Sequence, residues 1–306
     1  MNTYPIEEYK DPGNITLLQE IPDMPKKLYI SGNKGLLTLR NHTYICIVGS
    51  RRYSEYGKLA CIELLHALKG YPVVIVSGLN LGLDKIVHET ALSLNLPCIA
   101  VPASGLNDDV LYPRDNLNLS KQIREQSGLL ISEYEPNQRA SPWSFPMRNR
   151  IMAGLSHATL IIEAEKDSGT LITARLALEY NRDVLAVPGP IFSPTSEGTN
   201  SLLKNGAIPI CTGEDLLVAL RLKEAMLIRE ASEVEHLLNR CTSEELEILH
   251  FLKSPRTRAE IYETYDDTEI SKIEIIISML EVKKLIEERY GKIYRVYVIK
   301  DPPIFS

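Results

Sequence analysis

Short runs of apolar and β-branched residues recur between residues 44 and 187, and segments with helical periodicity separate them. The runs are YICIVGS, VVIVSG, PCIAVPAS, GLLISE, TLIIEA and DVLAVPG. After the first run, EYGKLACIELLHALKG carries apolar residues at spacings of three, at Leu59, Ile62, Leu65 and Leu68, and ends at a glycine. Continuous β-branched runs that alternate with helices are typical of a parallel sheet covered on both faces. The pattern therefore predicts an α/β fold with a doubly wound, mostly parallel sheet over residues 41–220.

The segments that flank this series have a different character. Residues 1–40 contain four prolines and little periodicity, so we expect a lead-in with short elements in YPIEEYKDP, LLQEIPDMP and KLYISGN. Residues 221–240 are polar and charged, as in a helical linker. Residues 241–306 contain three helical segments and then an alternating stretch around Tyr290–Gly291. Three helices followed by a hairpin predict a small C-terminal winged-helix domain.

Composition excludes several classes of protein. The chain has 306 residues and a formal net charge of −6, which argues against a protein that coats nucleic acid through overall charge but permits a local basic patch. No apolar run approaches the roughly 18 residues of a membrane span, and the N-terminus lacks the features of a signal peptide. The five cysteines are scattered and form no C-x-x-C pair. We therefore expect a cytoplasmic protein without a metal site, a membrane partner or a bound cofactor.

Small residues follow most of the predicted strands, at the sheet edge where open parallel sheets bind ligands. Gly49, Ser50 and Arg51 follow the first run, and Ser77 and Gly78 follow the second. Small residues let backbone amides approach a ligand, and arginine beside a helix start favours an anion such as phosphate. The alternative is that these glycines only form strand-to-helix turns.

A second candidate for anion binding precedes the helical segment TLITARLALEY. It consists of Ser168, Gly169 and Thr170, and its hydroxyls could equally serve only as a structural helix cap. The chain contains neither G-x-x-x-x-G-K-[ST] nor G-x-G-x-x-G, so ATP hydrolysis and ordinary dinucleotide binding have little support.

The stretch SPWSFPMRNRIMAGLS, residues 141–156, combines aromatic residues with arginines and has no acidic residue. Arginines can hold phosphates while aromatic rings stack on bases, which is what sequence-tolerant binding of a single strand requires. We expect Arg148, Asn149 and Arg150 to bind nucleic acid, with Phe145 rather than Trp143 as the stacking surface. The residues leave another interpretation open, in which the aromatic rings are packed and the arginines pair with acids such as Glu133 or Glu163.

Asp84 and His88 lie four residues apart, so they share a helix face. Two such groups without a third ligand are weak evidence for a metal. A local hydrogen bond or a contact with an anion is the favoured interpretation.

Several blocks together resemble the DNA-processing protein A (DprA/Smf) family. They are IVGSRRYSEYG, VSGLNLGLDKIVHETAL, LYPRDN, LLISEYEP, FPMRNRIMAGLS, EAEKDSGTLITARLALEYNRDVLAVPG and SEGTNSLLKNGA, in the family's order over about residues 40–215. The resemblance implies an extended Rossmann-like domain that binds and protects single-stranded DNA, forms a homodimer and helps load RecA recombinase in natural transformation. It carries over Gly49, Ser50, Arg51, Ser77, Gly78, Gly82, Asp84, Arg148, Asn149, Arg150, Ser168, Gly169 and Thr170.

The chain departs from the family pattern at two places. Leu81 stands where the family commonly has arginine, and Pro102–Asn107 replaces a Gly-rich turn. The C-terminal segment carries slightly more acidic than basic residues, which favours protein contact or regulation over DNA binding there.

Two other functions are compatible with parts of the sequence. The chain is also similar to nucleotide phosphoribohydrolases, which carry a catalytic Glu in P-G-G-x-G-T-x-x-E, but Thr173 occupies the matching position here. No general acid or base is then in place, so we expect a binding protein rather than an enzyme. A transcription regulator that uses the winged helix would instead prefer duplexes of particular sequence.

Overall fold

We describe a computed structural model of the chain, for residues 4–224, 237–265, 269–289 and 291–296. It divides into two compact units, Met1–Lys223 and Glu224–Ser306. Each unit is described separately below.

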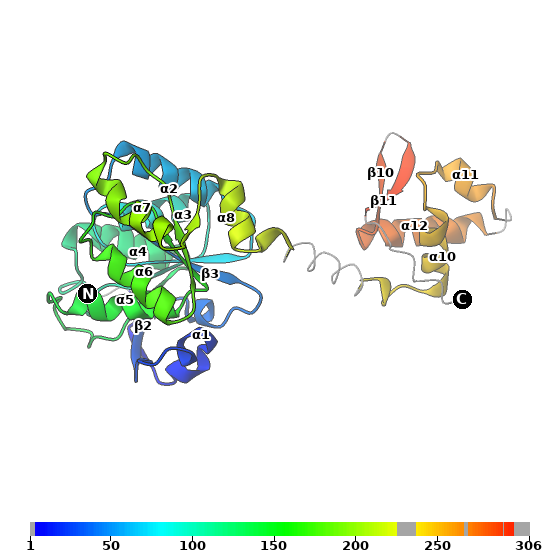
Figure 1. The fold of residues 1–306 in the computed structure, drawn as a ribbon. Helices are drawn as coiled ribbons and strands as arrows, with labels where there is room; N and C mark the ends of the chain where they lie inside the picture. Colours follow the sequence, from blue (N-terminus) through cyan, green and yellow to red (C-terminus); the bar gives the residue numbers. More distant parts are fainter. Residues whose placement is uncertain (1–3, 225–236, 266–268, 290, 297–306) are drawn as a thin grey trace. The chain divides into compact units, whose positions relative to one another are not determined.

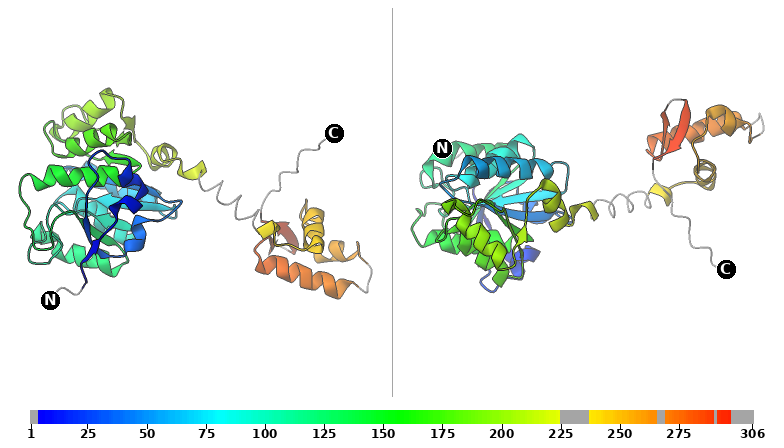
Figure 2. Two further views of the ribbon diagram at one scale, coloured as in Figure 1. Left: turned by 90° about the horizontal axis from the view of Figure 1, so that it is seen from below. Right: turned by 45° about the horizontal axis from the view of Figure 1, so that its top comes forward.

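The first unit is built on one nine-stranded sheet, which confirms the α/β prediction (Figures 1 and 2). The strand order is β1-β2-β6-β5-β4-β3-β7-β8-β9, and strands β3 to β9 run parallel to one another. The bounds are β1 Glu7–Tyr9, β2 Leu28–Gly32, β3 Thr43–Val48, β4 Val73–Ser77, β5 Cys98–Ala100, β6 Leu129–Ser132, β7 Ala158–Ile161, β8 Asp183–Ala186 and β9 Ile208–Pro209.

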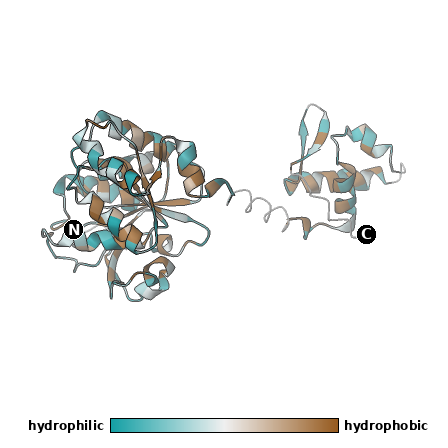
Figure 3. Ribbon diagram, in the orientation of Figure 1, coloured by the Kyte–Doolittle hydropathy of each residue, from teal (hydrophilic) through white to brown (hydrophobic). Residues whose placement is uncertain are grey.

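Helices cover both faces of this sheet, because alternate residues of each buried strand point to opposite sides. Ile45 and Ile47 of β3 join a core with helices α2, α3, α4 and α8, whereas Cys46 and Val48 join a core with α1, α5 and α6. Figure 3 shows the apolar colour along the strands between the two helical layers. The helices are α1 Thr16–Gln19, α2 Glu55–Ala67, α3 Leu83–Ser93, α4 Leu117–Glu125, α5 Ser144–Gly154, α6 Thr170–Glu179, α7 Glu197–Lys204 and α8 Gly213–Ala219.

The short elements expected in residues 1–40 are present, and they extend the main sheet. β2 pairs antiparallel with β6, and β1 pairs antiparallel with β2. Leu18 and Ile21 pack into the core beneath α5, where they lie within contact distance of Gly154. The N-terminal segment therefore belongs to the first compact unit.

The second unit has its own apolar core and the order of elements that the sequence suggested. It contains α10 Ser243–Phe251, α11 Arg258–Tyr262 and α12 Ile270–Val282, then the antiparallel strands β10 Ile286–Arg289 and β11 Lys292–Arg295. Of the expected linker, residues 225–236 lie outside the described part of the chain. The winged-helix assignment stays a prediction. No helix among the described residues combines the length and apolar character that crossing a membrane requires.

Candidate nucleic-acid interface

The candidate site lies where the strand order of the sheet reverses. From β3 the chain adds β4, β5 and β6 on one side, and then β7 and β8 on the other. Such a switch point leaves a crevice beyond the carboxyl ends of the strands, where open α/β sheets bind ligands. A cavity of about 550 Å³ is found there, lined by residues that follow β3 and β7 together with residues of α5. The cavity lies at the edge where the sequence analysis expects a ligand, and ligand binding there stays a prediction.

Arg148 forms the buried floor of this cavity. Its guanidinium donates to the carbonyl oxygens of Gly78 and Val101, which follow β4 and β5. Burial lowers the pKa of Arg148 to about 10, and the carboxylate of Asp84 opposes that change. The guanidinium therefore ties two strand ends together, and its predicted role as a phosphate ligand competes with these internal contacts.

Asp84 lies beside Arg148 at the start of α3. Its carboxylate accepts hydrogen bonds from the backbone and side-chain nitrogens of Asn80, at 3.3 and 2.7 Å. Burial raises the pKa of Asp84, and burial lowers the pKa of His88 to about 4. The local hydrogen bond favoured from the sequence exists, but its donor is Asn80 and not His88. No cluster of three or more metal-ligating side chains occurs among the described residues.

Arg150 has a different surrounding from Arg148, although only one residue separates them. Its guanidinium bonds both oxygens of Glu133 at 2.5 Å and the carbonyl oxygen of Asp23. It is not among the residues that line the cavity. The pairing with Glu133, which the sequence left open, is therefore found, and direct DNA binding by Arg150 stays a prediction without support from this geometry.

Arg51 lines the cavity, is exposed to solvent and has no acidic partner among the described residues. Its guanidinium carbon lies 5.0 Å from the centre of the Phe145 ring, as in a cation–π contact. The neighbouring Arg52 lies 3.4 Å from Glu165. Lys166, which the sequence analysis did not single out, also lines the cavity and has no ion-pair partner in the described part of the chain. Its place in the loop between β7 and α6 is the signal that could have identified it.

The glycines at this edge fall into two classes. A Cβ at Gly49 would collide with Leu83, and one at Gly78 would collide with Arg148 and Asp84. Close packing therefore requires those two glycines, a reason different from the strand-to-helix turns that the sequence suggested as the alternative. An added Cβ at Gly169 meets nothing within 4 Å, and its φ is −57°, so the fold does not itself require glycine there.

The N-terminus of α6 offers donors to the cavity. The amide of Thr170 donates to the Ser168 hydroxyl at 3.2 Å, and the Thr170 hydroxyl donates to the carbonyl of Gly49. The amide of Gly169 has no acceptor within the described chain, while its carbonyl accepts from Asn149. The first turn of α6 contains no acidic residue, whereas those of α2 and α3 contain Glu55 and Asp84. This end of the cavity therefore favours an anion.

The remaining predicted residues support the loops around the cavity. Ser77 is buried and its hydroxyl donates to the carbonyl of Ile47 at 2.7 Å. Ser50 lines the cavity, and its hydroxyl both donates to the Arg52 carbonyl and accepts from the Arg52 amide. Trp143 is exposed and contacts Tyr134 edge-on. Of the two aromatic candidates, Phe145 lines the cavity and Trp143 does not.

The cavity is not the uniformly basic pocket that three arginines suggested. Its lining includes Arg51, Arg52, Arg148 and Lys166, but also Asp84, Glu165, Asp167 and Glu197. The four positive charges are formally balanced by four negative charges. The internal hydrogen bonds of Arg148 and the Arg52–Glu165 pair leave Arg51 and Lys166 as the cations available to a ligand.

The family model described as DNA recombination-mediator protein A matches residues 4–221 of this chain. The chain belongs to this family. It is 41% identical over 204 residues to protein Smf of Escherichia coli K12, across 65% of this chain and 52% of that protein. It is 37% identical over 220 residues to DNA processing protein DprA of Bacillus subtilis 168, across 72% of this chain and 71% of that protein. The chain therefore spans only about half the length of the E. coli member of the DNA recombination-mediator protein A family.

Two solved members of the family share the fold. DprA of Streptococcus pneumoniae superimposes with a TM-score of 0.64 at 37% identity, over 71% of this chain and 74% of that one. DprA of Helicobacter pylori superimposes with a TM-score of 0.62 at 33% identity, over 71% of this chain and 96% of that one. The H. pylori protein was solved for its mode of binding single-stranded DNA. The family resemblance that the motifs suggested is confirmed.

Proposed function

We propose that the chain binds single-stranded DNA in the cavity at the switch point of its sheet. The observation that carries this proposal is the unpaired Arg51, placed over the Phe145 ring at the mouth of the cavity. A family member of similar fold binds single-stranded DNA, which supports the same substrate here.

The contacts of a bound strand divide between the two ends of the cavity. A phosphate binds at the start of α6, where the Gly169 amide is free, and Lys166 neutralises its charge. A base stacks at the other end against Arg51 and Phe145, because guanidinium planes and aromatic rings both accept the face of any base. The bases of a duplex are already stacked on each other, so this arrangement favours a single strand.

Arg51 provides the first test of this function. Fluorescence anisotropy measures the affinity of a labelled oligothymidine and of a matched duplex at several salt concentrations. We expect a preference for the single strand and a log–log salt slope of about −1.4, since two free cations contribute about −0.7 each for single strands. Arg51→Ala lowers the affinity by about tenfold or more and brings the slope to about −0.7.

Arg175→Ala is the matched control for Arg51→Ala. Arg175 is an exposed arginine of α6 that pairs with Glu179 at 3.8 Å and does not line the cavity. Its loss removes the same charge, but from a position outside the cavity. The affinity and the salt slope are therefore expected to stay at their wild-type values. Equal binding of single strand and duplex, or equal losses in the two variants, contradicts the proposal.

Protection of the strand, loading of RecA recombinase and formation of a homodimer belong to the same proposal. Their support is membership of a family described as recombination mediators. Two protomers would hold one strand at two points and gain affinity through effective concentration. Assembly of RecA on a single strand, measured with the wild type and with Arg51→Ala, tests this role, and equal assembly with both proteins contradicts it.

We propose further that binding is not coupled to catalysis. Thr173 lies buried in the cavity lining at the position that matches the glutamate of the nucleotide phosphoribohydrolases. A hydroxyl with an ordinary pKa is a poor general acid or base at neutral pH. Incubation with nucleoside monophosphates is expected to release no free base, and release of a base would favour the enzyme alternative.

A further inference from the structure

Tyr112 contacts Phe145, which lines the cavity, but does not itself line it. Neither the predicted site nor the proposed contacts include Tyr112. Its side chain is 44% exposed. Its ring centre lies 5.8 Å from that of Phe145 with an interplanar angle of 82°, an edge-to-face contact. Among the described residues, no hydrogen bond holds its hydroxyl. A hydrogen bond of the Tyr112 hydroxyl therefore does not explain why this ring is exposed.

The loop that carries Tyr112 is held firmly to the rest of the first unit. The Tyr112 amide donates to the Ser104 hydroxyl at 3.1 Å, and the Ser104 carbonyl accepts from Ser132 at 2.7 Å. The side chains of Leu106 and Leu111 are buried in the core beneath the loop. An exposed ring on a pinned backbone loses little conformational freedom when it binds a ligand.

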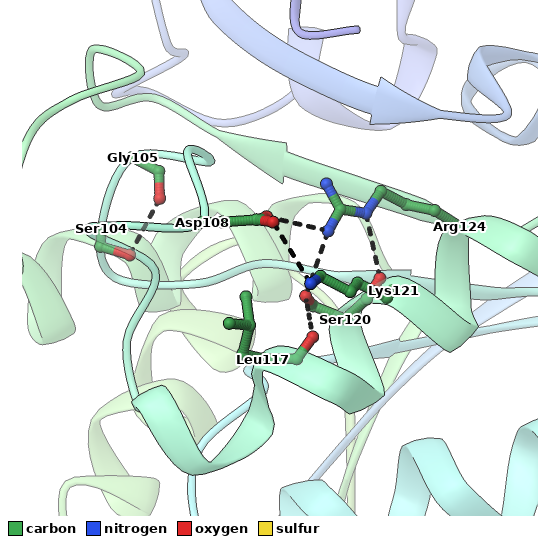
Figure 4. Close-up of polar contacts among 7 residues, drawn as sticks. All are labelled: Ser104, Gly105, Asp108, Leu117, Ser120, Lys121 and Arg124. Carbon is green, nitrogen blue, oxygen red and sulfur yellow. Dashed lines mark hydrogen bonds and ion pairs between the residues drawn. The ribbon is translucent and has the colours of Figure 1, made fainter. Parts of the chain in front are cut away.

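Asp108 provides a further attachment in the middle of this loop (Figure 4). Its carboxylate lies 3.5 Å from Lys121 Nζ and 3.4 Å from Arg124 Nη2, both on α4. The Arg124 side chain is almost fully buried and also donates to the carbonyl of Ser120 at 3.2 Å. Figure 4 shows the Asp108 carboxylate pointing toward both cationic side chains. The loop of residues 103–112, whose first part replaces a Gly-rich turn of the family, is thus anchored near its centre and presents Tyr112 at its end.

Arg51, Phe145 and Tyr112 form a continuous strip of contacts, of which Arg51 and Phe145 line the cavity and Tyr112 lies outside its lining. Arg51 lies over the Phe145 ring, and Tyr112 contacts that ring edge-on. No described carboxylate pairs with Arg51, and Tyr112 itself carries no charge. The strip therefore offers successive stacking surfaces without the negative charge that Glu165, Asp167 and Glu197 place around the other parts of the cavity.

We propose that Tyr112 is a second stacking residue, which holds the base adjacent to the one bound at Arg51 and Phe145 as the strand leaves the cavity. The inference rests on the proposed function and adds the direction of the strand: away from α6, past Phe145, and over the loop of residues 103–112. The ligand class is the nucleobase face of a single strand, without preference for a particular base.

Truncation of the ring tests this inference. Tyr112→Ala lowers the affinity for an oligothymidine of about 12 nucleotides by about 5- to 150-fold, the effect of removing one stacked base contact. Tyr112→Phe binds like the wild type, because stacking needs the ring and not the hydroxyl. For an abasic strand of the same length, the wild type and Tyr112→Ala bind equally, since only phosphates remain.

Tyr53→Ala is the matched control. Tyr53 has a similar exposure of 41%, directly follows Arg51 and Arg52 in the sequence, and lies outside the cavity lining. Its loss leaves affinity unchanged. Circular dichroism and the thermal midpoint confirm that each variant is folded.

Failure of this inference is distinguishable from failure of the proposed function. If the wild type prefers single strands and Arg51→Ala weakens binding, but Tyr112→Ala equals the wild type, then Tyr112 does not stack and the function stands. Equal losses for the thymidine and abasic strands in Tyr112→Ala also overturn the stacking role. If the wild type shows no preference for single strands, the proposed function itself fails.

Discussion

Arg51, Arg148 and Arg150 carry the same guanidinium, yet the fold gives each a different environment. Arg148 bonds two strand-end carbonyls and Arg150 bonds Glu133, whereas Arg51 lies over the Phe145 ring without an acidic partner among the described residues. Spacing in the sequence indicated that the stretch 141–156 matters, but it could not distinguish these roles. The carbonyls and carboxylates that engage two of the arginines come from segments 17 to 127 residues away.

Alanine substitutions at Arg148 and at Gly169 are expected to have different effects on the free energy of unfolding. Arg148→Ala leaves Asp84 buried without its cation, so the free energy of unfolding falls by about 3–5 kcal/mol. Gly169→Ala changes that free energy by less than about 1 kcal/mol, since a Cβ there meets open space. Urea unfolding measures both.

The same two variants separate stability from DNA binding. In the proposed complex a phosphate at the start of α6 approaches the Gly169 backbone, so the methyl group of Gly169→Ala is expected to lower DNA affinity in a fully stable protein. A wild-type affinity for Gly169→Ala would place the phosphate elsewhere. A loss of binding in Arg148→Ala does not identify a DNA ligand, because the fold of the cavity is affected as well.

The buried carboxylate of Glu163 joins three segments around the cavity. Glu163 follows β7 and accepts from the Ser54 amide at 2.9 Å, just before α2, and from the Thr195 hydroxyl at 2.9 Å. Ser54 is also the N-cap of α2. The position of the Arg51–Ser54 loop therefore depends on a residue that the sequence analysis considered only as a partner for arginines.

Glu163→Gln tests this dependence. The amide nitrogen cannot accept a hydrogen bond, so at least one buried donor loses its partner and unfolding becomes easier by about 1–3 kcal/mol. We expect a smaller loss of DNA affinity than in Arg51→Ala, because Arg51 is displaced but not removed. Glu165→Gln is the control: its exposed pair with Arg52 contributes less than about 1 kcal/mol, so stability is unchanged. Equal stability of Glu163→Gln and the wild type would contradict the account.

The elements themselves were largely predictable from the sequence. Strands β3 to β8 coincide with the six apolar runs, because a strand buried on both faces needs continuous apolar residues. The periodicity of three was less reliable for α2, where Leu65 and Leu68 are buried but Leu59 is 58% exposed. Two features depended on tertiary contacts and were missed: the pairing of β2 with β6, and the position of Tyr112 against Phe145.

For the whole molecule, a net charge of −6 means that DNA is not attracted by the overall field. The second unit does not alter this conclusion, because several of its cations are engaged with acids. Lys272 pairs with Glu244, and Lys283 pairs with Glu245. The outward residues Ile275 and Val282 of α12 are apolar and 65% and 77% exposed. The proposed binding of DNA is therefore expected to depend on local contacts in the first unit.

The most direct measurement locates a bound strand on the chain. An oligonucleotide substituted with iodouracil is photo-crosslinked to the full chain, and the modified peptides are identified by mass spectrometry. Adducts are expected on the peptide that contains Phe145 or on the one that contains Tyr112. These adducts are expected to disappear when an unlabelled single strand competes. Adducts confined to residues 241–296, or displaced by duplex as readily as by single strand, would contradict the claim that the switch-point cavity holds single-stranded DNA.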